Sequence, residues 1–223
     1  MSPDNANNAT LPFLLEIGSE EIPARFIPGA MEELEKRVGA ALAENHLECA
    51  GLRTLATPRR MALLADGLQV RQADREIEVK GPPVSVAFDA DGNPTKAGEG
   101  FARKTGVALA DCRRESDQRG EYLMATKLEE GRPAADVLAD VLPGIILGIP
   151  FRKVMRWGDH DVEYPRPLQW IVALLGGDVV PLKVDYFEAG RLSRGHRTLS
   201  GDKAVSYTHL TLPTTIGWCW CRW

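Results

Sequence analysis

Arginines and tryptophans alternate at short spacing in residues 151–170, and a shorter basic run follows at residues 190–197. Guanidinium groups bind phosphates through a planar fork of N–H donors, and flat aromatic rings stack on nucleobases. The combination is typical of a surface that contacts RNA or a partner protein. The candidate contact residues in this region are Arg152, Lys153, Arg156, Trp157, Arg166, Arg191, Arg194, His196 and Arg197.

The basic segment contrasts with the rest of the chain. Residues 152–197 contain eight lysines and arginines against six acids, a net charge of +2, whereas the whole chain of 223 residues carries −4. An acidic protein does not attract polyanions in bulk, so any such binding has to come from a local patch. Arg59 and Arg60, in a predicted turn, are either a second phosphate contact or a solvated corner.

The same residues also fit a purely structural role, in which arginines pair with nearby acids and tryptophans anchor the core. The pairs would join Arg152, Arg156 and Arg166 to Asp159, Asp161 and Glu163, and the anchors would be Trp157 and Trp170. A second alternative is a protein-docking module, in which the apolar stretch 137–151 and Met155-Arg-Trp157 supply an apolar anchor with an arginine rim.

An independent hydrolase is a third alternative. Its base would be His196 or His160, although a solvated turn is the simpler interpretation of Asp159-His160-Asp161. Glu20 and Glu21 would form a paired-carboxylate site only with a basic or metal partner that the sequence does not identify. The sequence contains neither His-x-Gly-His nor Lys-Met-Ser-Lys-Ser, and Cys219 and Cys221 have no second ligand pair nearby. We therefore predict no catalytic residue and no metal ligand.

The composition is that of a soluble globular protein, with 44% hydrophobic and 26% charged residues. No apolar run reaches the roughly 18 residues that a membrane span requires. The first residues have neither the basic nor the apolar region of a secretory signal. Cys49 and Cys112 are isolated, which is typical of reduced thiols. These features together predict a cytoplasmic protein.

The apolar patterns predict an α+β fold, in which mixed antiparallel sheets pack with a few helices, because no regular βαβ alternation is present. Expected strands cover residues 11–17, segments of 52–70 on both sides of a break at 57–60, 76–80, two segments of 109–128, 168–175 and 179–187. Expected helices cover residues 28–45 and 133–142, and a third runs from a Thr95 cap to residue 105, before Gly106.

Three regions of different character divide the chain. Residues 1–10 are polar and are predicted to be disordered. Residues 11–205 form the folded region, with a sub-boundary near 130–150 as an option. Residues 206–223 contain three of the five tryptophans, show no periodicity and resemble translated adapter sequence, so we expect a non-native tail and a truncated chain.

Several motifs in order resemble the bacterial glycyl-tRNA synthetase β subunit over residues 11–205. The motifs are residues 15–23 (LEIGSEEIP), 57–60 (TPRR), 80–83 (KGPP), 87–95 (AFDADGNPT), 155–158 (MRWG) and 194–197 (RGHR). The family is much longer than this chain, so the resemblance covers only its N-terminal portion.

The resemblance implies a subunit of an α2β2 glycine–tRNA ligase, a class II aminoacyl-tRNA synthetase that uses ATP with magnesium. Glycine activation is attributed to the α subunit, and the β subunit is needed for engagement of glycine tRNA and for full aminoacylation. The expected partners are therefore the α subunit and glycine tRNA, and this portion alone is expected to be inactive and to bind no cofactor.

Overall fold

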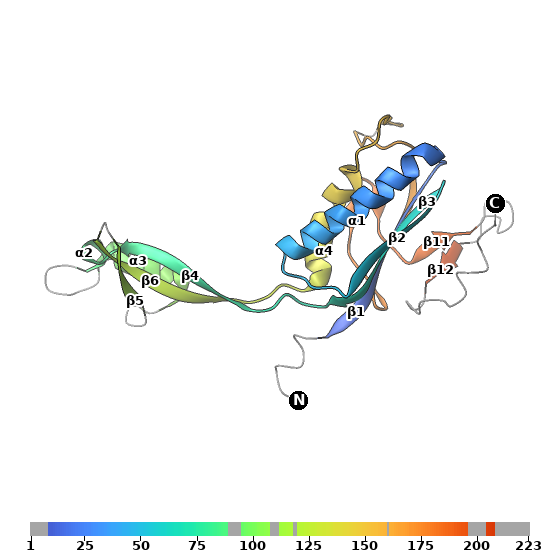
Figure 1. Ribbon diagram of the computed structural model, residues 1–223. Coiled ribbons are helices and arrows are strands. Elements are labelled where there is room, and N and C mark those ends of the chain that lie inside the picture. The colour runs from blue at the N-terminus through green and yellow to red at the C-terminus, as the bar shows by residue number, and fades with distance from the viewer. Residues whose placement is uncertain are drawn as a thin grey trace. The chain divides into compact units, whose positions relative to one another are not determined.

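The chain divides into two compact units, residues 1–72 with 132–223 and residues 73–131. The computed structural model describes residues 9–88, 95–107, 112–117, 120–159, 161–195 and 204–207 (Figure 1). Both units combine helices with antiparallel sheets, which confirms the predicted α+β class. The prediction included no boundary near residue 72. None of the helices in the described part of the chain is long and apolar enough to span a bilayer.

The first unit is built on a five-stranded antiparallel sheet with the strand order β2-β3-β1-β7-β8. The strands are β1 (Thr10–Ser19), β2 (Gly51–Thr57), β3 (Arg60–Gln69), β7 (Leu168–Leu175) and β8 (Asp178–Val179). Central strand β1 is a nearly continuous apolar run because both of its faces are covered, and its residues from Phe13 to Ser19 are all buried.

Two helices, α1 (Ile27–Glu44) and α4 (Ala134–Leu147), cover one face of this sheet (Figure 1). A 3-10 turn, η2 (Ala24–Phe26), leads into α1, and Pro28 lies in its first turn. Ala30, Leu34, Val38 and Leu42 recur at helical spacing and are all buried in the main core.

The opposite face of the sheet is covered by a short antiparallel pair, β11 (Leu192–Arg194) and β12 (Ala204–Ser206). Its core is small and consists of Leu14, Leu64, Trp170, Val172 and Leu174. A second short pair, β9 (Lys183–Val184) with β10 (Phe187–Glu188), connects β8 to β11.

The second unit is a three-stranded antiparallel sheet of order β4-β6-β5, with β4 (Arg75–Pro83), β5 (Arg113–Asp117) and β6 (Gly120–Glu129). Its helices are α2 (Val84–Ala87) and α3 (Lys96–Thr105). The Thr95 hydroxyl accepts a hydrogen bond from the Gly98 N–H, and Gly106 ends α3 with φ of 73°. The predicted cap and stop of this helix are therefore confirmed.

Three predicted elements were wrong in extent. The strand expected over 76–80 runs on to Pro83 as part of β4. Helix α4 continues past residue 142 because Leu142 and Ile146, on either side of Pro143, are both buried in the main core. This packing outweighs the hydrogen bond that proline cannot make. The strand expected over 179–187 is broken into β8, β9 and β10, since Pro181 cannot donate to a ladder and Asp185 turns the chain with φ of 55°.

Gly18 is required by the way one tryptophan packs across the sheet. Gly18 on β1 lies opposite Arg60 on β3 and opposite Trp170 on β7. A Cβ atom placed on Gly18 would be 2.1 Å from atoms of the Trp170 ring. The ring therefore lies directly on the glycine backbone, and no larger residue fits without displacing it.

We predict that Gly18→Ala destabilises the chain by roughly 1–3 kcal/mol, because the methyl group forces the indole out of its place. The measurement is urea unfolding followed by circular dichroism. Gly29→Ala is the matched control, since Gly29 lies in α1 and its added Cβ would meet nothing within 4 Å. Equal stability of the two variants would contradict this account of Gly18.

Candidate nucleic-acid or partner interface

Segments far apart in the sequence meet at one end of the five-stranded sheet. The loop after β1 lies between the turn joining β2 to β3 and the segment entering β7. Its backbone N–H groups fix this position: Ser19 donates to the Arg59 carbonyl at 3.0 Å, Glu20 to Pro167 at 2.9 Å and Ile22 to Pro58 at 2.7 Å. The folding of these segments brings together candidate residues Arg59, Arg60, Arg166 and Arg194.

Trp170 lies beside two of these arginines. The guanidinium carbon of Arg60 is 5.7 Å from the centre of the Trp170 ring, and that of Arg194 is 5.6 Å away. Both distances are within the range of cation–π attraction. The Arg60 guanidinium also donates to the Arg194 carbonyl. We call Arg60, Trp170 and Arg194 the arginine–tryptophan cluster.

A buried carboxylate, Glu16, holds this cluster in place. Its side chain is 2% exposed and accepts hydrogen bonds from Trp170 Nε1 at 2.6 Å and from the Ser193 hydroxyl. Arg60 Nε lies 3.4 Å from the same carboxylate, and the Tyr207 hydroxyl donates to it at 3.0 Å. A buried charge requires such compensation. Glu16 therefore connects β1 to β3, β7 and β11.

Burial, followed by the charge of Glu16, raises the pKa of Tyr207 to about 12. The Tyr207 hydroxyl therefore keeps its proton at physiological pH and remains a donor to Glu16.

Arg59 and Arg166 fasten the loop after β1. Arg59 lies 3.7 Å from a carboxylate oxygen of Glu20. Arg166 donates to the Glu21 carbonyl at 3.1 Å and to the Pro165 carbonyl at 3.0 Å. Glu20 thus has the basic partner that the sequence did not identify, and the described residues contain no group of acids, histidines and cysteines able to hold a metal ion. The contacts seen are those of the Glu20 side chain with Arg59 and of the Glu21 carbonyl with Arg166, and both hold this loop in place.

The segment after α4 carries several exposed cations. Arg152 and Lys153 are exposed and are not paired with an acid in the described part of the chain. Arg156 Nη2 is 3.0 Å from Glu163 and Nη1 is 4.0 Å from Asp161. Among the expected local pairs within the described residues, those of Arg156 form, whereas Arg166 binds carbonyls instead.

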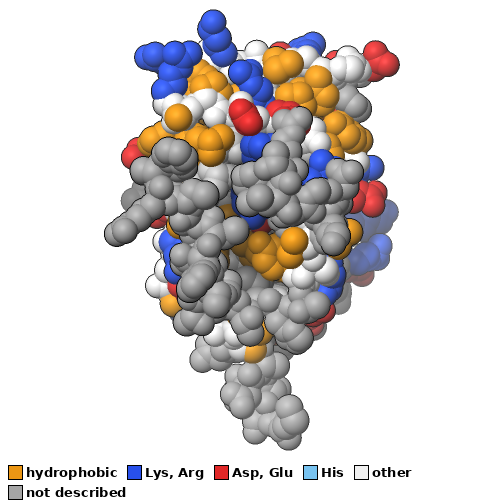
Figure 2. Space-filling view, turned by 90° about the vertical axis from the view of Figure 1, so that its right-hand side faces the viewer, with side chains coloured by type: hydrophobic (Ala, Val, Ile, Leu, Met, Phe, Trp, Pro, Cys, Tyr) orange, Lys and Arg blue, Asp and Glu red, His pale blue; other side chains and the backbone are white. Residues whose placement is uncertain are grey.

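An exposed apolar surface lies on the same segment and on the turn between β9 and β10. Val154 is 46% exposed, Met155 39% and Tyr186 45%. Trp157 Nε1 donates to the Tyr186 hydroxyl at 3.1 Å, and the Trp157 side chain packs against the main core. Figure 2 shows the face over β11 and β12, where lysine and arginine side chains lie beside hydrophobic ones along the upper edge.

The remaining candidates flank β11 in the sequence. Arg191 donates to the Gly177 carbonyl at 3.1 Å and to the Tyr207 carbonyl at 3.5 Å, so it has a structural role. His196 and Arg197 lie outside the described residues, as does His160. Sequence reasoning missed Glu16, Ser193 and Gln169, the last of which accepts from Arg194 Nη1 at 3.1 Å. The one available indication was a lone acid within the apolar run of residues 11–17.

Comparison with known proteins gives one consistent family. The family model described as glycyl-tRNA synthetase beta subunit matches residues 13–211. The chain is 50% identical over 188 residues to the glycine–tRNA ligase beta subunit of Syntrophotalea carbinolica, covering 84% of this chain and 27% of the relative. It is 49% identical over 186 residues to that of Geobacter metallireducens, covering 83% and 27%, and 46% identical over 195 residues to that of Desulforamulus reducens, covering 87% and 28%.

The chain spans about a quarter of the length of the curated relatives it matches. The family match ends inside residues 206–223, so the non-native origin of that segment stays a prediction.

We predict that Glu16→Ala destabilises the chain by roughly 3–5 kcal/mol, because it removes the acceptor of the Trp170 N–H and the Ser193 hydroxyl and the charge partner of Arg60. Glu16→Gln should cost less, since the amide oxygen still accepts. Glu21→Ala is the control, because its side chain is exposed and its contact within the described residues is made by its backbone carbonyl. Urea unfolding measures all three, and an equal loss in Glu21→Ala would refute the role of Glu16.

Proposed function

This chain belongs to the glycyl-tRNA synthetase beta subunit family, and from that premise we propose that it is the N-terminal part of the β subunit of an α2β2 glycine–tRNA ligase. Its contribution is engagement of glycine tRNA and assembly with the α subunit. The ligase is a cytoplasmic class II aminoacyl-tRNA synthetase that uses ATP with magnesium. Glycine is activated on the α subunit, and this portion alone is inactive.

The observation that supports tRNA engagement best is the arginine–tryptophan cluster. Arg194 is exposed, and in the described part of the chain its side chain contacts Trp170 and Gln169 rather than an acid. A guanidinium held in place loses little conformational freedom when it binds a phosphate. The exposed pair Arg152 and Lys153 extends the cationic surface on another segment of the same unit.

Because Arg60 is engaged by Glu16, Arg194 is the member of the cluster that can be changed with the least effect on folding. We predict that Arg194→Ala weakens tRNA binding by the complete ligase about 10–100-fold, as expected for a charge-assisted hydrogen bond. The slope of log K against log salt should also become shallower by roughly 0.7–0.9, for one lost phosphate contact.

Lys183→Ala is the matched control, since Lys183 is an exposed cation on β9 outside the arginine–tryptophan cluster. Binding and unfolding should be measured together, so that a folding defect is recognised. Unchanged affinity and an unchanged salt slope in Arg194→Ala would remove the cluster from the RNA interface.

A protein-interaction module without direct RNA contact is the second candidate. The exposed Val154 and Met155 support it, because aliphatic side chains neither stack on bases nor bind phosphates. The charge of Arg156 is partly neutralised by Glu163. Together with Trp157 and Tyr186, Arg156 gives this surface the aromatic and arginine side chains that are common in binding hot spots. The α subunit is the partner in this proposal.

We predict that Met155→Asp weakens association with the α subunit by about 30-fold or more in the absence of RNA, because a hot-spot residue contributes about 2 kcal/mol or more. Calorimetry or analytical ultracentrifugation of purified subunits measures this. Leu128→Asp is the control, since Leu128 is a still more exposed apolar residue on β6. Association that resists Met155→Asp would exclude this surface from the subunit interface.

A further inference from the structure

Helix α3 presents a basic face on the second unit. Its exposed residues are Lys96, Ala97, Glu99, Gly100, Arg103 and Lys104. At 3.6 residues per turn, the three cations and Gly100 fall within about 100° of one another, on the side opposite the buried Phe101. We call Lys96, Gly100, Arg103 and Lys104 the basic face of α3. None of its cations is paired with an acid among the described residues, and Glu99, one turn before Arg103, forms no ion pair with it.

The basic face contrasts with the unit that carries it. Residues 73–131 contain nine lysines and arginines against twelve acids, a net charge of −3. The exposed side of α3 has three cations and the single acid Glu99. The second unit therefore holds a local positive surface on an acidic background, and attraction of an anion to it would be local.

Two residues of the basic face act against the helix that contains them. Lys96 is the first residue of α3, where the helix dipole disfavours a positive charge. Gly100 lies in the helix interior, where only proline is a poorer helix former. Nothing in the described chain requires a glycine there, since an added Cβ would meet nothing within 4 Å. Local choices that weaken an element without a structural gain are expected at functional sites.

The chemistry of this face fits the phosphate backbone of a nucleic acid. Lys96 and Lys104 are about 12 Å apart along the helix axis, a span that covers several phosphates of one strand. Gly100 lies between them and leaves the helix backbone bare, so a phosphate can approach it closely. A protein partner fits less well, because α3 exposes no aromatic or large aliphatic side chain and lysine is depleted in protein interfaces.

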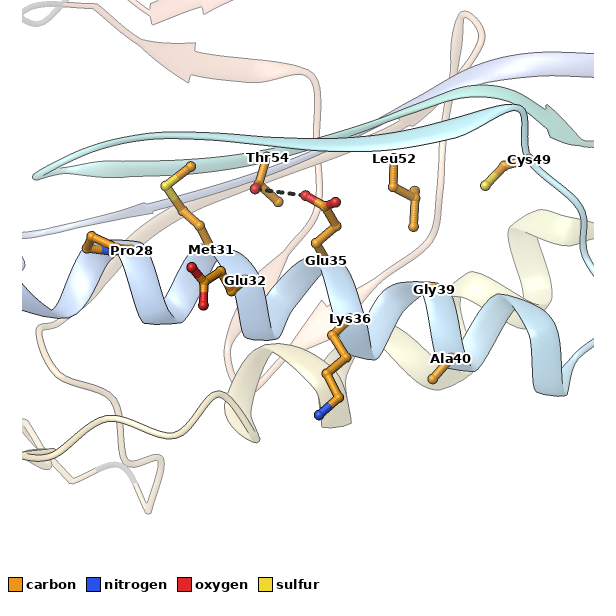
Figure 3. Close-up of a pocket in the computed structure, with 10 residues that line it drawn as sticks. All are labelled: Pro28, Met31, Glu32, Glu35, Lys36, Gly39, Ala40, Cys49, Leu52 and Thr54. Carbon is orange, nitrogen blue, oxygen red and sulfur yellow. Dashed lines mark hydrogen bonds between the residues drawn. The ribbon is translucent and has the colours of Figure 1, made fainter.

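The open groove of the first unit has a different character. It lies between α1 and β2 and has a volume of about 910 Å³ (Figure 3). Glu32 and Glu35 line it together with Lys36, and the Thr54 hydroxyl donates to the Glu35 carboxylate at 3.1 Å (Figure 3). These carboxylates repel phosphates, so the groove is not an alternative site for the same ligand.

We infer that the basic face of α3 binds the phosphate backbone of tRNA. Its three cations neutralise phosphates, and Gly100 allows the strand to approach the helix. The contact is made to the backbone, so it positions the tRNA without reading its sequence. This inference rests on the proposed engagement of tRNA, and it adds a contact on residues 73–131 to the one proposed for the arginine–tryptophan cluster.

The first test removes one charge from the basic face in the complete ligase. Arg103→Gln should weaken binding of glycine tRNA about tenfold, and the slope of log K against log salt should become shallower by roughly 0.7–0.9. Arg113→Gln is the matched control, because Arg113 is an exposed arginine of the same unit. Arg113 pairs with Met124 on β6, whereas the adjacent Leu123 packs with Phe101 of α3. Arg113 therefore lies on the sheet face away from α3, and its change should leave affinity and slope unaltered.

The second test separates tRNA binding from folding. Glutamine is a better helix former than glycine, so Gly100→Gln should raise the urea midpoint of this chain. It should nevertheless weaken tRNA binding by the complete ligase several-fold, because the new side chain covers the bare helix backbone. Gly144→Gln is the control, since Gly144 is an equally open glycine of α4 with no lysine or arginine three or four residues away. Its change should raise the midpoint and leave binding unaltered.

The outcomes distinguish this inference from the proposed function. If either Arg103→Gln or Gly100→Gln binds tRNA as the unchanged ligase does while Arg194→Ala weakens binding, the inference fails and the proposed function stands. If none of these three changes affects binding, both fail. An Arg103→Gln ligase that loses affinity for the α subunit in the absence of RNA would also overturn the inference, because the basic face would then be a protein interface.

Discussion

The buried carboxylate of Glu16 is the constraint on which one end of the five-stranded sheet depends. Without its partners it would be an uncompensated charge inside an apolar sheet, so the fold has to deliver the Trp170 N–H, the Ser193 hydroxyl and the Arg60 guanidinium to one point. Those partners come from three other strands, and their meeting fixes how β11 lies against the sheet. The neighbouring Gly18 then leaves the space that the indole occupies.

This arrangement separates two kinds of arginine that are alike in the sequence. Arg166 and Arg191 donate to backbone carbonyls and connect segments of the chain, so they belong to the architecture. Arg152 and Arg194 are exposed and bind no acid in the described region. The basic segment thus contains arginines that hold chain segments together and a few arginines that are free to bind a ligand. Amino-acid composition alone cannot distinguish these two kinds.

Local patterns predicted most of the elements but little of the site. The period of α1, the Thr95 cap and the Arg156–Glu163 pair depend on residues close in sequence, and all three were expected. Helix α4 continues through Pro143 because the burial of Leu142 and Ile146 outweighs the hydrogen bond lost at the proline. Burial depends on the whole fold and cannot be read from local sequence. The contact of Glu16 with Ser193 joins residues 177 positions apart, which no local spacing encodes.

The small number of exposed cations without an acidic partner limits how strongly phosphate binding by this region can depend on salt concentration. Arg152, Lys153 and Arg194 are the exposed candidate cations in the described part of the chain that lack an acidic partner. If each neutralises one phosphate, the slope of log K against log salt is roughly −2 to −3. Among the other described candidates, a steeper slope would draw on cations that already hold an acid or a carbonyl, and for Arg60 and Arg59 the acids are buried or half-buried. Arg60 contacts both Glu16 and the Arg194 carbonyl. If Arg60 left these contacts to bind a phosphate, β11 would be held less firmly and Arg194 would be less well positioned. Phosphate binding by Arg60 would therefore weaken phosphate binding by Arg194.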